Sequence, residues 1–157
     1  MKQYIFIAFL SLLFFSQTVA AEETYFTAKG FEDGKDLVFR GKYAEGVVKS
    51  DYPYLLRIYW SYFDVNNSGM PDASTMDSQF EFEEDISKLD TNGLGHLVLV
   101  ATGNSRKEWV LYVKNPIVWQ KKLNQVLKDK QTYPLKIVET YQPDWDLYSD
   151  FMKNLKD

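Results

Sequence analysis

The fold is decided by residues 96–113, which read His96-Leu-Val-Leu-Val-Ala-Thr-Gly-Asn-Ser-Arg-Lys-Glu-Trp-Val-Leu-Tyr-Val113. Two runs rich in Val, Leu and aromatic residues flank residues 102–106, which is the pattern of a β-hairpin. Gly103 and Asn104 tolerate positive φ, as a tight turn requires. Residues 97–101 are apolar on both faces, so we expect this strand to be covered on both sides.

A strand and a helix are predicted before the hairpin. In residues 54–62 the bulky apolar side chains alternate with Arg57 and Ser61, which is the period of a strand. The turn formers of residues 64–71 end it. We expect the helix to begin near Ser74 and Asp77, which form a weak capping box, and to end at Asn92-Gly93. Its predicted buried stripe consists of Met76, Phe80, Ile86 and Leu89.

The segment after the hairpin predicts a helix, a strand and a terminal helix. Asn115 is a natural N-cap and Pro116 a natural first helical residue. The predicted buried face of this helix comprises Val118, Trp119, Leu123, Val126 and Leu127. Residues 135–141 follow Pro134 as a strand, and Asp144 is expected to cap the terminal helix. That helix should pack through Trp145, Tyr148, Phe151 and Met152.

The resulting order, βαββαβ, predicts an α+β fold of the ferredoxin-like sandwich type, with helices on one face of an antiparallel sheet. An N-terminal hairpin is added, with strands near residues 25–26 and 37–39 around a turn at 30–34, and residues 42–51 read as a further strand and connection. In the ferredoxin-like order residues 97–101 would form an edge, so we place the added hairpin beside them. Residues 21–157 then form a single domain with a C-terminal helix.

Residues 1–20 predict a cleaved secretory signal. Lys2 supplies a positive charge, residues 4–15 are apolar apart from Ser11, and small residues precede cleavage after Ala20 or Ala21. This apolar run is shorter than the roughly 20 residues that span a bilayer. We therefore expect a periplasmic or secreted protein with no membrane span in the mature chain.

Composition argues against several classes of function. Without Lys2 the chain has 17 basic and 22 acidic residues, a net charge near −5, and its arginines are only Arg40, Arg57 and Arg106. Nucleic acids are bound by clustered cations, so we expect no nucleic-acid partner. The chain has no Cys, which excludes disulfides, thiol catalysis and Cys-based metal sites. His96 is the only His and reads as a half-exposed structural residue. We expect no cofactor.

The turn-rich segment contains a weak calcium candidate. Asp64, Asn66 and Ser68, followed by Gly69 and Asp72, match the start of an EF-hand loop. Position 12 of that loop is Thr75 in place of the bidentate Glu, and a strand precedes it. An Asx-rich turn before a helix explains the same residues.

Candidate binding residues lie at the hairpin tip and at the start of the last helix. The tip contributes Asn104, Arg106 and Trp109, and the helix start contributes Asp144 and Trp145, because polar groups beside exposed aromatic rings form recognition patches. Arg106 could instead pair with an acid, and both Trp rings could be buried. The acids Glu81, Glu83, Glu84 and Asp85 are interpreted as a solvated helix face.

Several segments together resemble one bacterial family, domain of unknown function 695. They are Asp64…Asn67-Ser-Gly69-Met-Pro71-Asp72, Glu83-Glu-Asp85-Ile86, Leu99-Val-Ala-Thr-Gly103-Asn-Ser-Arg106-Lys-Glu-Trp109-Val-Leu-Tyr112, Tyr133-Pro134 and Pro143-Asp-Trp145-Asp-Leu-Tyr148. The resemblance covers residues 54–151. It implies a ferredoxin-like fold distantly similar to regulator of ribonuclease activity B, which acts by binding an enzyme. It implies no catalytic residue.

The sequence favours an exported, non-catalytic interaction module that binds a protein or envelope component. Two alternatives remain. One is a small hydrolase that uses Asp, Glu and Tyr groups, and the other is a weak calcium-binding module.

Overall fold

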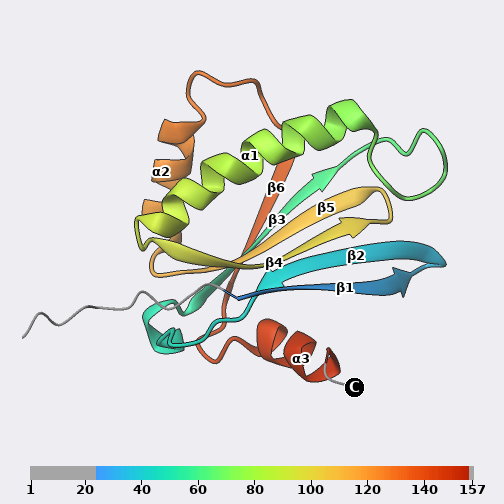
Figure 1. Ribbon diagram of the computed structural model, residues 1–157. Coiled ribbons are helices and arrows are strands. Elements are labelled where there is room, and N and C mark those ends of the chain that lie inside the picture. The colour runs from blue at the N-terminus through green and yellow to red at the C-terminus, as the bar shows by residue number, and fades with distance from the viewer. Residues whose placement is uncertain (1–23, 156–157) are drawn as a thin grey trace, which may run out of the picture.

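The computed structural model describes residues 24–155, so the predicted signal segment lies outside the described residues. The described chain folds as one six-stranded antiparallel sheet with three α-helices (Figure 1). The elements are β1 (Tyr25–Glu32), β2 (Lys35–Lys42), a short 3-10 helix (Lys49–Asp51), β3 (Tyr54–Ser61), α1 (Ala73–Thr91), β4 (Gly95–Gly103), β5 (Arg106–Val113), α2 (Pro116–Val126), β6 (Leu135–Tyr141) and α3 (Asp146–Asn154).

The sheet has the order β1-β2-β4-β5-β3-β6, and every neighbouring pair is antiparallel. From β3 to β6 the chain follows the predicted βαββαβ order, and the α+β fold class is confirmed. The added hairpin β1-β2 pairs with β4 through the register Leu37↔Gly103 to Gly41↔Leu99. β4 is therefore an interior strand, and its side chains enter the cores on both faces of the sheet, Val100 on one face and Val98 and Leu99 on the other, which explains why both of its faces are apolar.

The predicted bounds of the added hairpin were wrong. Gly30 lies inside β1, and the turn consists of Asp33 and Gly34, which have φ of 51° and 75°. Two consecutive positive φ values make a type I′ turn, whose twist suits two antiparallel strands. Residues 43–51 form a connection with one 3-10 turn and no second strand.

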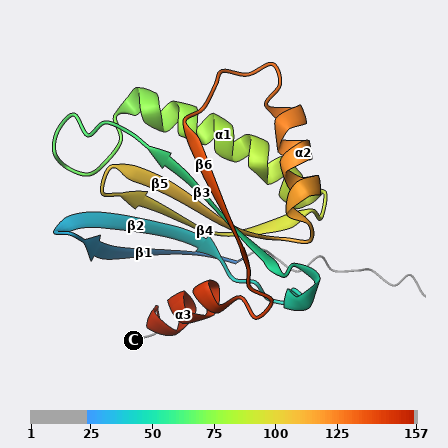
Figure 2. The same cartoon turned by 180° about the vertical axis from the view of Figure 1, so that it is seen from behind.

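Helices lie on both faces of the sheet, whereas the prediction placed them on one face. α1 and α2 cover one face, and α3 covers the other beneath β1, β2 and β4 (Figures 1 and 2). The first core contains Ile58, Phe82 and Trp119, among others. The second contains Tyr112, Trp145 and others. An irregularity between Leu97 and Leu99 in β4 places both Val98 and Leu99 in the second core.

The central hairpin turns through Asn104 and Ser105, both with positive φ (48° and 61°). Gly103, which precedes them, has φ of 141°, and a Cβ atom there would lie 2.2 Å from the carbonyl oxygen of Asp36. Only glycine fits this position, because β2 approaches the backbone so closely.

Helix α1 differs from its prediction in cap and in face. The predicted cap was the Ser74–Asp77 pair, but the N-cap is Asp72. Its carboxylate accepts a hydrogen bond from Thr75 N. Met76 and Phe80 are 39% and 47% exposed, so the predicted stripe was half wrong. The buried side chains are Gln79, Phe82, Asp85, Ile86 and Leu89, and their i, i+3, i+6, i+7, i+10 spacing places them on a single helical face.

The later elements follow their predictions more closely. Asn115 caps α2, Pro116 begins it, and β6 spans the predicted residues. Val118 is exposed, contrary to the prediction, because only Pro116, Trp119 and Leu123 turn fully inward. The N-cap of α3 is Trp145, in a left-handed conformation (φ 58°) without a side-chain cap, so the predicted Asp144 cap was wrong.

Candidate functional site

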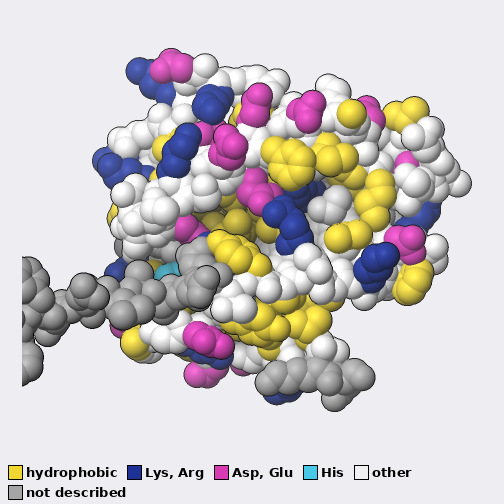
Figure 3. All heavy atoms as spheres, in the orientation of Figure 1, with side chains coloured by type: hydrophobic (Ala, Val, Ile, Leu, Met, Phe, Trp, Pro, Cys, Tyr) yellow, Lys and Arg dark blue, Asp and Glu magenta, His cyan; other side chains and the backbone are white. Residues whose placement is uncertain are grey.

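A groove lies between helix α1 and the strands β2 and β4, with a volume of about 500 Å³. It forms because the hairpin β1-β2 widens the sheet beyond the part that α1 and α2 cover. We call it the α1 groove. Figure 3 shows this face, where acidic and basic side chains lie among hydrophobic ones beneath the helix. Its lining includes Tyr25, Phe80, Leu97 and Val100 as apolar members, and Arg40, Lys42, Glu83, Glu84 and Asp90 as charged members.

Glu83, on α1, is the centre of the polar cluster in this groove. Its two carboxylate oxygens accept from Arg40 Nη2 at 2.8 and 2.9 Å. Oε2 also accepts from the indole Nε1 of Trp109 at 3.0 Å, and the Lys107 ammonium lies 3.4 Å away. The four residues come from α1, β2 and β5, so the cluster joins the helix to the sheet.

Burial and charge act in opposite directions on Glu83. Burial raises the pKa of this carboxyl, but the Trp109 hydrogen bond and the charges of Lys107 and Arg40 together lower it below its ordinary value. Glu83 is therefore ionised at neutral pH. A carboxylate with three donors around it is a fixed acceptor and counter-ion.

Lys107 is an almost fully buried lysine, with 3% of the residue exposed. Its ammonium lies 4.9 Å from the ring centre of Phe80 and 5.2 Å from that of Trp109, within the range of cation–π attraction. Burial lowers the pKa of Lys107, while the charge of Glu83 opposes that shift. The positive charge is thus compensated by one carboxylate and two rings.

Asp90 secures the far end of the groove. Its carboxylate accepts from Leu97 N at 3.0 and 2.8 Å, where the pairing of β4 is irregular. Lys42 lies 4.0 Å from the same carboxylate. These contacts hold the last turn of α1 on β4.

The predicted hairpin residues contact the added hairpin. The Arg106 guanidinium donates to Glu32 at 2.5 and 2.9 Å, and the Asn104 amide donates to the same carboxylate at 2.9 Å. The hydrogen bonds from Arg106 first, and then from Asn104, lower the pKa of Glu32 to about 2. Arg106 and Asn104 therefore join the turn of β4-β5 to the end of β1.

The two predicted tryptophans are fully buried, on opposite faces of the sheet. Trp109 packs under α1. Trp145 stacks on Tyr112 at 4.1 Å and donates to the carbonyl of Tyr52 at 2.9 Å. Asp144, beside it, is exposed. The structure thus separates Trp145 and Asp144 from the hairpin residues, and the five do not form one patch.

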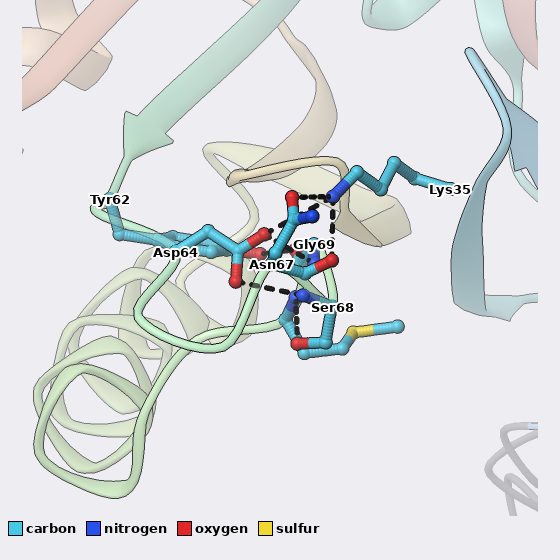
Figure 4. Close-up of polar contacts among 7 residues, drawn as sticks. Lys35, Tyr62, Asp64, Asn67, Ser68 and Gly69 are labelled. Carbon is cyan, nitrogen blue, oxygen red and sulfur yellow. Dashed lines mark hydrogen bonds and ion pairs between the residues drawn. The ribbon is translucent and has the colours of Figure 1, made fainter.

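A lysine side chain lies in the calcium candidate loop (Figure 4). The Asp64 carboxylate accepts from Ser68 N at 3.0 Å and Gly69 N at 2.6 Å. The Lys35 ammonium lies 3.5 Å from Asp64 Oδ2 and donates to both oxygens of Asn67 at 2.7 Å. Asn66 is exposed, Ser68 Oγ accepts a hydrogen bond from Met70 N, and Asp72 caps α1. Over residues 24–155 no group of three or more His, Cys, Asp or Glu is placed to hold a metal ion.

Arg40, Glu83 and Lys107 form the polar cluster of the groove, and sequence reasoning did not group them as a candidate site. Lys107 carried a signal, because it shares the inward face of β5 with Trp109, Leu111 and Val113, and a charge on such a face needs a partner. Arg40 and Glu83 carried none. They are 43 positions apart and meet only because β2 lies beside β4 under α1.

No helix within residues 24–155 is both long and apolar enough to cross a membrane. Comparison with curated proteins and with solved structures found no match, so the resemblance to regulator of ribonuclease activity B stays a prediction. The family of unknown function DUF695 matches residues 42–153. This span includes α1, β3 to β6 and most of α3, and it contains the whole of the predicted resemblance. Because the match covers well over half of the sequence, the chain belongs to the family DUF695.

Proposed function

We propose that the protein is an exported, non-catalytic binding module, and that the α1 groove is its binding site. The observation that supports this most strongly is the groove itself. It is a concave space of about 500 Å³, within the range of about 300–1,000 Å³ that small-molecule sites occupy. Its lining combines an apolar floor with a few charged groups, which is the composition of such sites.

The contacts of Glu83 favour binding over catalysis. A general acid or base must be able to exchange a proton near the operating pH, and in carboxyl groups this requires a raised pKa. The pKa of Glu83 is lowered instead, because Trp109, Lys107 and Arg40 outweigh the effect of burial. The hydrolase alternative would need this carboxylate to leave its partners. A fixed carboxylate that orients Arg40 needs no such change.

The amino-terminal sequence supports export. Lys2, the apolar residues 4–15 and the small residues before Glu22 have the order of a secretory signal. Expression of the full chain in a bacterium with an intact secretion pathway should yield a periplasmic or secreted protein whose mass corresponds to a first residue of Ala21 or Glu22. A full-length mass in the cytoplasmic fraction would contradict export.

The binding site is tested by a fragment screen monitored by ¹H–¹⁵N NMR. Ligands of this module should shift the amide signals of Gly41, Leu99 and Val100. A groove-filling variant, Ser87→Trp, should abolish these shifts, because Ser87 lines the groove from α1. Ser74→Trp is the matched control, since Ser74 lies exposed on the first turns of the same helix outside the lining. A screen whose hits all shift other residues, or whose hits survive Ser87→Trp, would overturn the assignment.

A further inference from the structure

We propose that the α1 groove binds a carboxylate attached to an apolar group, and that the Arg40 guanidinium is the group that recognises the carboxylate. This inference rests on the proposed function and specifies the ligand class. Two sources share that chemistry. One is a small organic acid with an aryl or alkyl body, and the other is the C-terminal carboxylate of a peptide.

Arg40 retains hydrogen-bond donors for a ligand. Its side chain is 46% exposed and lines the groove. Both contacts with Glu83 use Nη2 alone. Among residues 24–155, Nε and Nη1 have no hydrogen-bond partner. A guanidinium carries five N–H donors in a planar fork that matches the two oxygens of a carboxylate.

Glu83 holds this guanidinium in place before a ligand arrives. Glu83 is fixed from behind by two largely buried residues, Trp109 and Lys107. A ligand carboxylate therefore meets an arginine whose side-chain orientation is already restricted. Such preorganisation reduces the entropy lost on binding.

The charge at the centre of the groove also suits an anion. Next to Arg40, the charge of Glu83 is shared with the Lys107 ammonium, which lies buried behind Glu83 and outside the groove lining. Glu83 therefore does not cancel the positive charge that Arg40 presents to the groove. Lys42 and Asp90 compensate each other at the far end, and Glu84 is exposed at the rim. An anion is therefore attracted to the Arg40 position and repelled at the rim, which fixes its orientation.

The rest of the lining suits an apolar body. The Phe80 ring is about half exposed on α1, and Tyr25 on β1 is exposed beside the groove. Leu97 and Val100 form the floor between them. Covering these side chains removes apolar surface from water, which is favourable in proportion to the area covered.

The test measures affinity by NMR titration of the mature protein with 3-phenylpropionate and with its neutral amide, 3-phenylpropanamide. A short peptide ending in phenylalanine, with a free or an amidated C-terminus, tests the second source. We expect the free acids to shift the backbone amide signals of the groove residues. They should bind about tenfold more tightly than the corresponding neutral amide compounds, because a charge-assisted hydrogen bond to Arg40 is lost in the neutral compounds. Tighter binding of the small acid or of the peptide acid identifies the source.

Three variants separate recognition from net charge. Arg40→Gln should weaken acid binding about tenfold. Arg40→Lys keeps the charge without the fork and should cause a smaller loss. Lys136→Gln, on the exposed surface of β6, removes the same charge elsewhere and should leave the affinity unchanged. ¹H–¹⁵N spectra check that each variant is folded.

Equal affinities for acid and amide, or an Arg40→Gln variant that binds the acid as the parent does, would overturn the ligand class but not the groove. If no compound in the fragment screen shifts the groove amides, both this inference and the proposed function fail.

Discussion

The substitution Glu83→Gln offers the sharpest test of how the polar cluster is balanced. It keeps the size of the side chain and an acceptor for Trp109 but removes the charge that compensates the buried Lys107 ammonium 3.4 Å away. At an effective dielectric constant of about 20, this pair interaction amounts to about 5 kcal/mol. Part of this loss is offset, because a neutral Gln side chain costs less to bury than a carboxylate. We therefore expect a net loss of about 3 kcal/mol in the free energy of unfolding at pH 7.

The loss should depend on pH, because Lys107 then loses the charge that opposes its desolvation. Its folded-state pKa already lies below the ordinary value through burial, and without the Glu83 charge it falls further. Between the folded and unfolded pKa values the unfolded chain binds more protons, so stability rises with pH in that interval. The deficit of the variant should therefore be smaller at pH 9.5 than at pH 7.

Urea unfolding followed by tryptophan fluorescence measures the loss in the free energy of unfolding at pH 7 and at pH 9.5. Glu84→Gln is the matched control. It removes the same charge from the neighbouring, exposed position of α1 and should change stability by less than about 0.5 kcal/mol. Adding Lys107→Met to Glu83→Gln should recover about 2 kcal/mol, since an apolar side chain replaces the unpaired charge. A loss below about 1 kcal/mol at pH 7, or an equal loss at both pH values, would refute the reasoning.

Three further perturbations address the rest of the structure. Asp72→Ala removes the N-cap of α1 and should lower the free energy of unfolding, measured in urea, by about 1 kcal/mol. Ser74→Ala should lower it by less than about 0.5 kcal/mol. A larger loss for Ser74→Ala than for Asp72→Ala would indicate that Ser74 is the N-cap. Trp145→Ala should cost about 3–5 kcal/mol, because the ring is fully buried, and a loss under about 1 kcal/mol would argue against that packing. The pKa of Glu32 is about 2 when folded, below its ordinary value of 4.5, so its pairing with Arg106 stabilises the fold above about pH 4.5 and is lost as the pH falls toward 2. Melting curves at pH 7 and pH 3 should therefore show a smaller acid effect in Glu32→Gln than in the parent, and identical acid effects would contradict the pairing.

The strands β3 to β6 and the turn between β4 and β5 were predictable. Strand β6 spans the predicted residues, and the α2 N-cap Asn115 and the turn at Asn104 lie where their side chains favour them. These features depend on neighbours in the sequence, through alternation, capping hydrogen bonds and the tolerance of positive φ. The position of the added hairpin beside β4 was also predicted from local information, because a strand so rich in apolar side chains is unsuited to an exposed edge of a sheet.

The charged residues could not be placed in this way. Asp85 was expected in solvent but is completely buried, because Lys130 approaches it to 2.8 Å from the segment after α2 and Lys88 from its own helix. Glu83 faces the groove because Arg40 and Lys107 meet it there. A helical wheel assigns such residues to the outside by type alone. Burial of a charge depends on a partner, and the partner is absent from the local window.

The sequence by itself determined the βαββαβ order, the antiparallel hairpins and the membership in DUF695, because each of these depends on periodicity and on motifs read along the chain. Only the tertiary structure decided that the added hairpin opens a groove beside α1, that Arg106 and Asn104 fasten that hairpin, and that Glu83 orients Arg40. The physical reason is the range of the interactions. Backbone conformation is set by neighbours within a few residues, whereas a binding groove and its charges are set by residues that are distant in sequence and adjacent in space.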